Sequence, residues 1–168
     1  MSRHYSQPNG FVGRNICYRI YVLADGALIP YGAIVAGSAT LHLKPRDEFF
    51  GPVSLNQIVN NTFFHVERAR DGTYPIRNFT TEIIRKFRSV VVRDWNAQYG
   101  DIVVGFESLV EVPRTGKLYL RDGWVDVGVT KGFTCKRVAG RGTDSWSGRR
   151  VWDTENLRPK RILVRRVE

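Results

Sequence analysis

The alternation of apolar and polar residues near the start of the chain predicts a β-hairpin. Residues 16–22 and residues 28–39 are rich in β-branched and aromatic side chains, which favour strands. The pair Asp25-Gly26 between them is typical of the tight turns that join antiparallel strands. Residues 1–14 are polar and contain proline and glycine, so we expect an N-terminal arm before the hairpin.

A helical period occurs in the middle of the chain. Apolar side chains between residues 83 and 95 recur at the spacing of one helix face, which predicts an amphipathic helix packed on a sheet. Tyr99-Gly100 is predicted to end this helix. Residues 101–112 are the most apolar segment, and we expect a central strand that Pro113 ends. The residues of the helix face are Ile83, Ile84, Phe87, Val91 and Trp95.

The pattern between hairpin and helix is less regular. Residues 41–43 are expected to extend the second strand. Lys44-Pro45 is expected to end it, because the residue before a proline disfavours helix and proline donates no ladder hydrogen bond. Residues 48–51 predict a loop or a single helical turn.

Two asparagines interrupt the next apolar run. Residues 55–59 and 63–66 read as one strand, with Asn60 and Asn61 inside it. Buried amides need hydrogen-bond partners. The pair therefore indicates either a β-bulge or turn, or a polar step that faces a substrate.

The last third of the chain predicts short elements. Residues 118–124 favour a short helix or turn, and residues 125–130 and 133–138 favour a closing hairpin. Residues 140–149 form a loop rich in Gly, Ser and Arg. Residues 157–167 alternate apolar and basic side chains, which predicts an edge strand.

Length and charge place these elements in one domain with a basic tail. The chain has 168 residues, a usual size for one domain. We divide residues 1–168 into the arm at 1–14, a core at 15–130, and closing strands with a basic arm at 131–168. This last segment holds 11 Lys and Arg against 4 Asp and Glu, out of a net charge of +10. Such a field favours polyanions, nucleic acid first, although a solvated or ribosome-like basic face has the same composition.

Cysteines and histidines add little chemistry. Cys17 and Cys135 lie too far apart in the sequence for a zinc pattern or a disulfide framework, and the three histidines are scattered, so we expect no metal site. No signal peptide or membrane-spanning apolar run is visible. We therefore expect a cytoplasmic protein.

The start of the central helix is a candidate anion site. Free backbone amides and the helix dipole favour an anion there, and an Arg can grip phosphate with two hydrogen bonds. The alternative is a helix capped by Asn78 or Thr80 beside a surface Arg. The candidate residues are Arg77, Asn78, Phe79, Thr80 and Thr81.

Three further residues are candidates for catalysis. Glu107 and Ser108 follow an apolar strand, where partial burial can raise a carboxylate pKa toward that of a general base. The alternative for Glu107 is a carboxylate held by a neighbouring Arg. Tyr119 is either a proton donor to a leaving group or a core residue.

The basic arm has the composition of a nucleic-acid contact. Lys and Arg neutralise phosphates, and a Trp can stack on an unpaired base. An enzyme that acts on one base must remove it from the stack. Trp146 suits that role, unless it only anchors the arm to the body. The candidate DNA-binding residues are Lys131, Arg137, Arg141, Trp146, Arg149 and Arg150.

The order of these elements resembles the GNAT acyltransferase fold. The chain follows that order: a hairpin, a strand, a capped helix and an apolar strand come first. Gly116-x-x-Tyr119 and an aromatic residue then precede a closing strand. The resemblance implies an α+β (α/β) fold, with a mixed, mostly antiparallel central sheet flanked by helices and a basic C-terminal extension. In GNAT proteins the loop before the central helix holds the pyrophosphate of acetyl-CoA. Residues 75–81 occupy that place without the usual Gly-x-Gly, so the donor stays open, with acetyl-CoA or a related acyl donor as candidate.

A second resemblance is to Mom-type phage DNA-modification proteins and the related domain of the DruA protein of Druantia defence systems. Short motifs occur in the expected order over residues 15–165. This resemblance implies addition of a carbamoylmethyl group to the adenine amino nitrogen of double-stranded DNA, which protects phage DNA from restriction. Many Mom proteins have Asp where this chain has Glu107. The motifs are Pro45-Arg46-Asp47, Val59-Asn60-Asn61, Arg77-Asn78, Phe106-Glu107-Ser108, Gly116-Lys117-Leu118-Tyr119, Gly123-Trp124 and Pro159-Lys160-Arg161.

From these resemblances we expect a single-domain DNA adenine transferase. Glu107 would be the base or orienter near the amine, and Tyr119 a proton donor or hydrogen-bonding group. Ser108 and Asn61 would be polar contacts, with Asp47 as a second carboxylate. The first alternative is a GNAT-derived nucleic-acid-binding module of a defence or anti-defence system that has lost its chemistry. The second is a GNAT enzyme acting on a protein or small amine.

Overall fold

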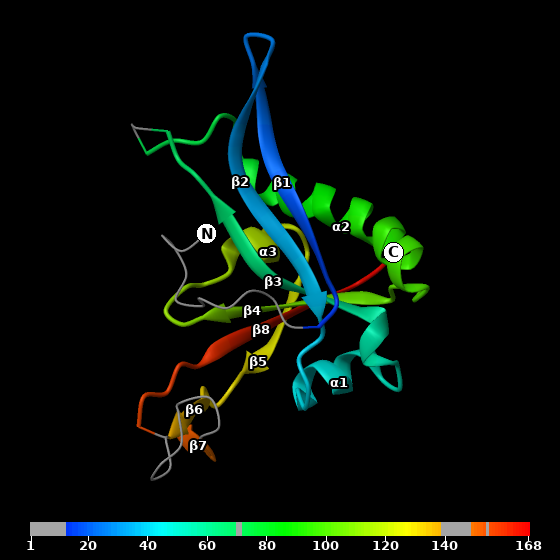
Figure 1. The fold of residues 1–168 in the computed structure, drawn as a ribbon, viewed down its shortest axis with the longest axis vertical. Coiled ribbons are helices and arrows are strands. Elements are labelled where there is room, and N and C mark those ends of the chain that lie inside the picture. The colour runs from blue at the N-terminus through cyan, green and yellow to red at the C-terminus, as the bar shows by residue number, and fades with distance from the viewer. Residues whose placement is uncertain (1–12, 70–71, 139–148, 154) are drawn as a thin grey trace.

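The computed structural model describes residues 13–69, 72–138, 149–153 and 155–168 and shows a mixed α+β fold (Figure 1). Six strands form one sheet in the order β1-β2-β3-β4-β8-β5, and β6 and β7 pair separately. Four of the five strand pairs in the large sheet are antiparallel, and β3 with β4 is parallel. The expected mostly antiparallel sheet flanked by helices is therefore confirmed.

The predicted N-terminal hairpin is present. β1 (Asn15–Ala24) and β2 (Ala27–Ser38) are antiparallel neighbours joined at Asp25-Gly26, where both residues have positive φ. β2 continues the sheet by pairing with β3 (Ile58–Val66). The N-terminal arm expected before the hairpin lies almost entirely outside the described residues.

The parallel contact between β3 and β4 (Gly105–Glu111) is short. Ile58, Val59 and Asn60 pair with Gly105, Phe106 and Glu107, and no pair follows Asn60–Glu107. β4 then pairs along its whole length with β8 (Lys160–Arg166), and β8 pairs with β5 (Val125–Val129). The two halves of the sheet thus meet at their common end and separate beyond Glu107.

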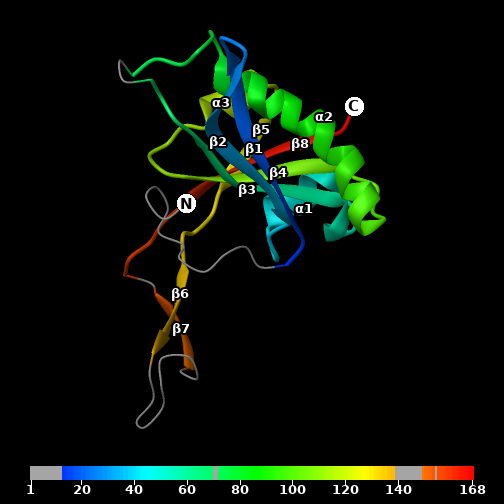
Figure 2. The same cartoon turned by 45° about the horizontal axis from the view of Figure 1, so that its top comes forward.

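Helices cover both faces of the sheet (Figure 2). α2 (Phe79–Tyr99) buries four residues of its predicted apolar stripe in a core with Ala36, Phe106 and Leu163, whereas Ile83 is half-buried. The four are Ile84, Phe87, Val91 and Trp95. α1 (Lys44–Phe50) and the short 3-10 helix η1 (Leu55–Gln57) supply the opposite core, which contains Ile162 and Val164. Because adjacent strand residues point to opposite faces, neighbours such as Leu163 and Val164 enter different cores. α3 (Lys117–Arg121) packs on the α2 side.

The segment from residue 41 to residue 66 differs from the prediction in two places. Residues 41–43 do not extend β2, and α1 begins at Lys44. Pro45 is tolerated because it lies in the first helical turn, where its missing N–H has no partner to lose. β3 continues through both asparagines, and its register shifts opposite Val35 and Ala36, so Thr62 is the bulged residue.

The end of the chain also differs. β5 does not form a hairpin with β6 (Thr134–Val138), because β5 pairs with β8 and β6 pairs with β7 (Arg149–Asp153). β8 is an internal strand rather than an edge, since its apolar run Ile162–Val164 is buried between β4 and β5. Most of the predicted loop at 140–149 lies outside the described residues.

The start of α2 lacks the predicted side-chain cap. Asn78 is the N-cap residue, with a left-handed backbone (φ 59°), and no side chain caps the helix. Gly100 ends the helix in a left-handed conformation, as predicted. None of the helices in the described residues combines the length and apolar character that crossing a bilayer requires.

Candidate functional site

A pocket opens where β3 and β4 separate. Its volume is about 680 Å³, and it lies between the second half of β3, the second half of β4 and the start of α3. We call it the divergence pocket. Three of the residues predicted to be catalytic line it, namely Asn61, Ser108 and Tyr119. All three are buried.

Hydrogen bonds fix the polar groups of the pocket. Asn61 Nδ2 donates to the carbonyl oxygens of Val35 (3.2 Å) and Phe63 (3.1 Å), which leaves Oδ1 as an acceptor. The Tyr119 hydroxyl donates to that Oδ1 at 2.5 Å, and Ser108 Oγ donates to the Asn61 carbonyl at 3.4 Å. The Tyr119 proton therefore points at Asn61, so toward any other group the hydroxyl oxygen acts as an acceptor.

A glycine turn positions Tyr119. Gly116 has a left-handed backbone (φ 66°) as the N-cap of α3, and its carbonyl accepts from the Tyr119 amide at 2.9 Å. The Tyr119 ring packs against Trp124 with centroids 5.0 Å apart. The tyrosine thus belongs to the core, which agrees with one of the two alternatives from the sequence, and its hydroxyl also lies at the pocket. A role as proton donor to a leaving group stays a prediction.

The rim of the pocket is mainly cationic. Arg114 and Lys117 are exposed and Lys160 is half-buried, with Glu111 as the rim carboxylate. Within the part of the chain that the structure describes, these three cations form no ion pair. An exposed cation cluster without partners favours an anionic ligand.

A histidine that the sequence did not single out also lines the pocket. His65 lies near the end of β3, and its Nε2 is 3.1 Å from Glu67 Oε1. A carboxylate on one ring nitrogen fixes the tautomer and orientation of the imidazole. The sequence does not indicate this role, because a single histidine in an apolar run has no recognisable pattern and its contact with Glu67 depends on the backbone at the end of β3.

Glu107 lies on the other face of the sheet. Its side chain is fully buried and forms an ion pair with Arg46 Nη1, while the Thr40 amide donates to its second oxygen at 2.6 Å. Arg46 Nη2 also donates to the Thr40 carbonyl at 2.8 Å. Burial raises the pKa of the Glu107 carboxyl, and the Thr40 amide and Arg46 oppose that shift. The alternative of a carboxylate held by an Arg describes this arrangement.

Asp47 is also separated from the divergence pocket. It accepts from Arg46 Nε at 2.7 Å, and its side chain is half-exposed in an open cavity of about 520 Å³ with His42, Lys44 and Glu48. The structure therefore brings together three of the five predicted catalytic residues and leaves Asp47 and Glu107 on the α1 side. Alternation along β4 explains the split, because adjacent Glu107 and Ser108 point to opposite faces.

The predicted cofactor residues surround the start of α2 but do not line the divergence pocket. Arg77 and Asn78 are exposed, Thr80 is half-buried and Thr81 is buried. Thr81 Oγ1 donates to the carbonyl of Leu118, a pocket residue, at 3.4 Å. The ring of Phe79 is buried rather than presented to a ligand.

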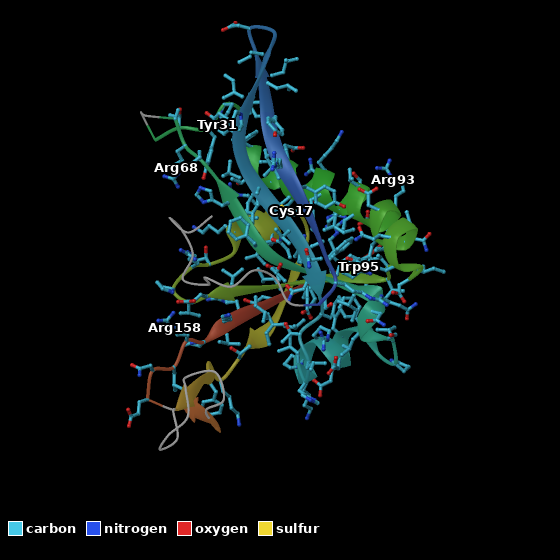
Figure 3. The ribbon with its side chains drawn as sticks, in the orientation of Figure 1. Cys17, Tyr31, Arg68, Arg93, Trp95 and Arg158 are labelled. Atoms are coloured by element: carbon cyan, nitrogen blue, oxygen red, sulfur yellow. The ribbon has the colours of Figure 1, made fainter. Side chains whose placement is uncertain are left out.

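Phe79 anchors the helix start in an aromatic group. Its ring lies 5.7 Å from Tyr31 and 6.0 Å from Tyr74 between centroids. Arg68 lies over the Tyr74 ring, and Figure 3 shows Tyr31 and Arg68 on the same upper part of the molecule. These contacts link the start of α2 to β2 and to the loop after β3.

The predicted DNA-binding residues that the structure describes lie in or next to the β6–β7 hairpin. Lys131 is exposed just before β6, Arg137 lies on β6, and Arg149 and Arg150 lie on β7. Arg141 and Trp146 lie outside the described residues. The rim cations Arg114, Lys117 and Lys160 are not among the predicted binding residues, although Lys117 and Lys160 belong to two of the sequence motifs.

The described residues contain no group of three His, Cys, Asp or Glu side chains that could hold a metal ion. No family model matches the chain, and no curated protein matches it. One solved structure, described as the C-terminal condensation domain of Ebony in complex with beta-alanyl-dopamine, is similar over 83% of this chain and 67% of its own. The identity is 11% and the TM-score 0.40, so this likeness carries no argument about function.

Proposed function

We propose that this protein is a transferase that modifies the exocyclic amine of adenine in double-stranded DNA. The observation that carries the proposal is the divergence pocket, where fixed polar groups from β3, β4 and α3 converge beneath a cationic rim. Such a site suits a polar ligand with anionic groups. The strongly basic chain supports a nucleic acid as the acceptor. An enzyme of this type would act in the host cytoplasm.

The pocket offers groups for amine chemistry. A lone pair of the Tyr119 hydroxyl accepts a hydrogen bond from the amine, because the hydroxyl proton is directed to Asn61. Attack of the amine nitrogen on the carbonyl carbon of an acyl thioester would form the new carbon–nitrogen bond and break the carbon–sulfur bond, with the coenzyme A thiolate as leaving group, and the amine must also lose a proton. His65, held by Glu67, accepts that proton. Tyr119 thus orients the nucleophile in this proposal.

Glu107 acts as a positioning residue in this mechanism. It pairs with Asn60 at the last rung of the parallel contact, and its ion pair with Arg46 ties β4 to α1. The next residues on the two strands, Asn61 and Ser108, line the pocket. The ion pair therefore stabilises the end of the β3–β4 contact, beyond which the two strands separate to form the pocket walls.

The donor in this proposal is acetyl-CoA or a related acyl donor. Such a donor gives adenine with an acyl group on its amine. The carbamoylmethyl group implied by the resemblance to Mom-type proteins would instead require a donor whose methylene carbon carries the leaving group. Thermal-shift screening with acyl-CoA compounds tests the donor directly, since a ligand that binds the native state raises the melting temperature.

Nucleoside mass spectrometry on plasmid DNA from expressing cells tests the proposal. We expect a new deoxyadenosine species with the mass of the added group, and its loss in Tyr119→Phe. Unmodified DNA in two different hosts that contain folded wild-type protein would contradict the enzyme assignment.

A second candidate is a nucleic-acid-binding module without chemistry. The observation that favours it is the placement of the predicted catalytic and cofactor residues, since Glu107 is enclosed and the start of α2 lies beside the pocket rather than in it. Salt-dependent DNA binding together with unmodified DNA would identify this second function. Weak, salt-insensitive DNA binding would instead point to a protein or small amine as acceptor.

A further inference from the structure

The β6–β7 hairpin projects from the body of the protein (Figure 2). Its two strands pair with each other and with no strand of the large sheet. Hydrogen bonds hold its base, where the Arg158 amide donates to the Gly132 carbonyl and the Thr130 amide donates to the Lys160 carbonyl, both at 2.8 Å. A two-stranded ribbon is marginally stable alone in water. We therefore expect a binding partner to stabilise this projecting ribbon.

The sequence of this ribbon is basic. β6 reads Thr-Cys-Lys-Arg-Val and β7 reads Arg-Arg-Val-Trp-Asp, which places four cations and one carboxylate on two short strands. Arg137 and Arg150 are register partners, as are Val138 and Arg149. Like charges directly opposite each other, as at Arg137 and Arg150, destabilise a strand pair, and a bound anion would offset that repulsion. The register thus favours an anionic partner for the ribbon.

A line of cations connects the ribbon to the divergence pocket. We call Arg114, Lys117, Lys131, Arg158 and Lys160 the basic tract. These residues come from three segments that are joined by backbone hydrogen bonds. In one of these bonds, the Val112 amide donates to the Pro159 carbonyl at 3.0 Å. Within the described part of the chain, no member of the tract forms an ion pair. Figure 3 shows Arg158 on the opposite flank from Arg93.

We propose that the β6–β7 ribbon enters the major groove of duplex DNA while the basic tract binds the phosphate backbone that leads to the divergence pocket. The major groove, about 12 Å wide, admits a two-stranded ribbon, whereas the minor groove is about 6 Å wide. The adenine amine also lies in the major groove. This inference rests on the proposed function for its partner, but it concerns binding alone and needs no donor.

The experiment measures binding of the full-length protein to a fluorescent duplex by anisotropy at several salt concentrations. Lys117→Gln/Arg158→Gln removes two tract charges, and Lys86→Gln/Arg93→Gln removes two exposed charges from α2 as the matched control. Each lost phosphate contact reduces the magnitude of the slope of log K against log salt by about 0.9. The slope should therefore fall by roughly 2 in the tract variant and stay unchanged in the control variant. Melting temperatures of both variants confirm folding.

The groove is tested with the same assay. A duplex whose cytosines carry glucosylated hydroxymethyl groups is blocked in the major groove, and we expect at least a tenfold loss of affinity. Netropsin, which fills the minor groove, should leave binding unchanged. The variant Arg137→Ala/Arg150→Ala should bind the plain duplex more weakly than the wild type does. It should also bind the plain and glucosylated duplexes with equal affinity.

The outcomes separate this inference from the proposed function. Wild-type protein that binds no duplex overturns both. Displacement by netropsin, or equal salt slopes for the tract and control variants, overturns the groove assignment even where adenine is modified. Binding with the expected slopes and groove preference, but with unmodified adenine, supports the inference and removes the enzyme.

Discussion

The Tyr119 hydroxyl donates a 2.5 Å hydrogen bond to Asn61 Oδ1, and Asn61 is itself oriented by the carbonyl oxygens of Val35 and Phe63. Two backbone carbonyls on β2 and β3 thereby set the direction of a hydroxyl on α3. These hydrogen bonds connect the bulged part of β3 to α3 at the place where β3 and β4 separate. It also defines which hydrogen bonds a ligand in the divergence pocket can make.

Tyr119→Phe is predicted to lose adenine modification and to lower stability. Removal of the hydroxyl leaves a buried Asn61 oxygen without its donor, which costs about 1–3 kcal/mol. Urea denaturation measures the stability change, and nucleoside mass spectrometry measures the product. Tyr21→Phe is the matched control, because Tyr21 is 44% exposed. Full modification by Tyr119→Phe would remove the tyrosine from the mechanism.

The buried pair of Arg46 and Glu107 predicts a strongly coupled double-mutant cycle. Glu107→Leu leaves the buried Arg46 guanidinium with the half-exposed Asp47 as its remaining carboxylate partner, and loss of one partner from a buried pair costs up to about 3–5 kcal/mol. Adding Arg46→Leu removes the under-compensated buried charge, so the double variant should be more stable than Glu107→Leu alone. Urea midpoints of the four proteins give the coupling energy. Simple additivity would show that the pair does not act as a unit.

The sequence predicted the local elements better than their pairing. The N-terminal hairpin and the α2 stripe follow from short-range periodicity and turn chemistry, which depend only on neighbouring residues. The place of β8 between β4 and β5 depends on contacts across the whole chain, and an apolar-basic alternation does not distinguish an edge strand from an internal one. Pro45 was misinterpreted because a proline that ends a strand can also begin a helix.

The candidate site shows the same limit. Asn61, Ser108 and Tyr119 were predicted as polar residues in apolar surroundings, and the structure gathers them. Glu107 was grouped with Ser108 because they are adjacent in sequence, although adjacency on a strand puts them on opposite faces. The rim cation Lys160 joins the pocket only through the antiparallel pairing of β8 with β4, which no local pattern reveals.

His65→Gln is predicted to lower the rate of modification by about 10²–10⁴-fold, the usual contribution of a general base. Glutamine keeps a hydrogen-bonding side chain toward Glu67 but does not accept a proton near neutral pH. His42→Gln is the matched control, since His42 is exposed and lines the separate cavity on the α1 side. Single-turnover kinetics on duplex DNA measures the effect. Equal rates for both variants would assign the proton transfer to another group.

Gly116→Ala is predicted to disrupt the pocket through the backbone. Gly116 has φ 66°, and a Cβ at this position would lie 2.5 Å from Leu163 Cδ1, so the side chain adds both strain and a clash with the core. Overpacking of this kind costs about 1–3 kcal/mol. Because Gly116 is the N-cap of α3, relaxation of the clash should move Lys117 and Tyr119 together and weaken DNA binding as well as catalysis.

Gly26→Ala provides the control for backbone strain alone. Gly26 also has positive φ, at 76°, but a Cβ there meets no atom within 4 Å. The control should therefore lose stability and keep full modification, whereas Gly116→Ala should lose both. Urea denaturation and single-turnover rates distinguish the two. If Gly116→Ala retained the wild-type rate despite its lower stability, the α3 turn would have no part in positioning Tyr119.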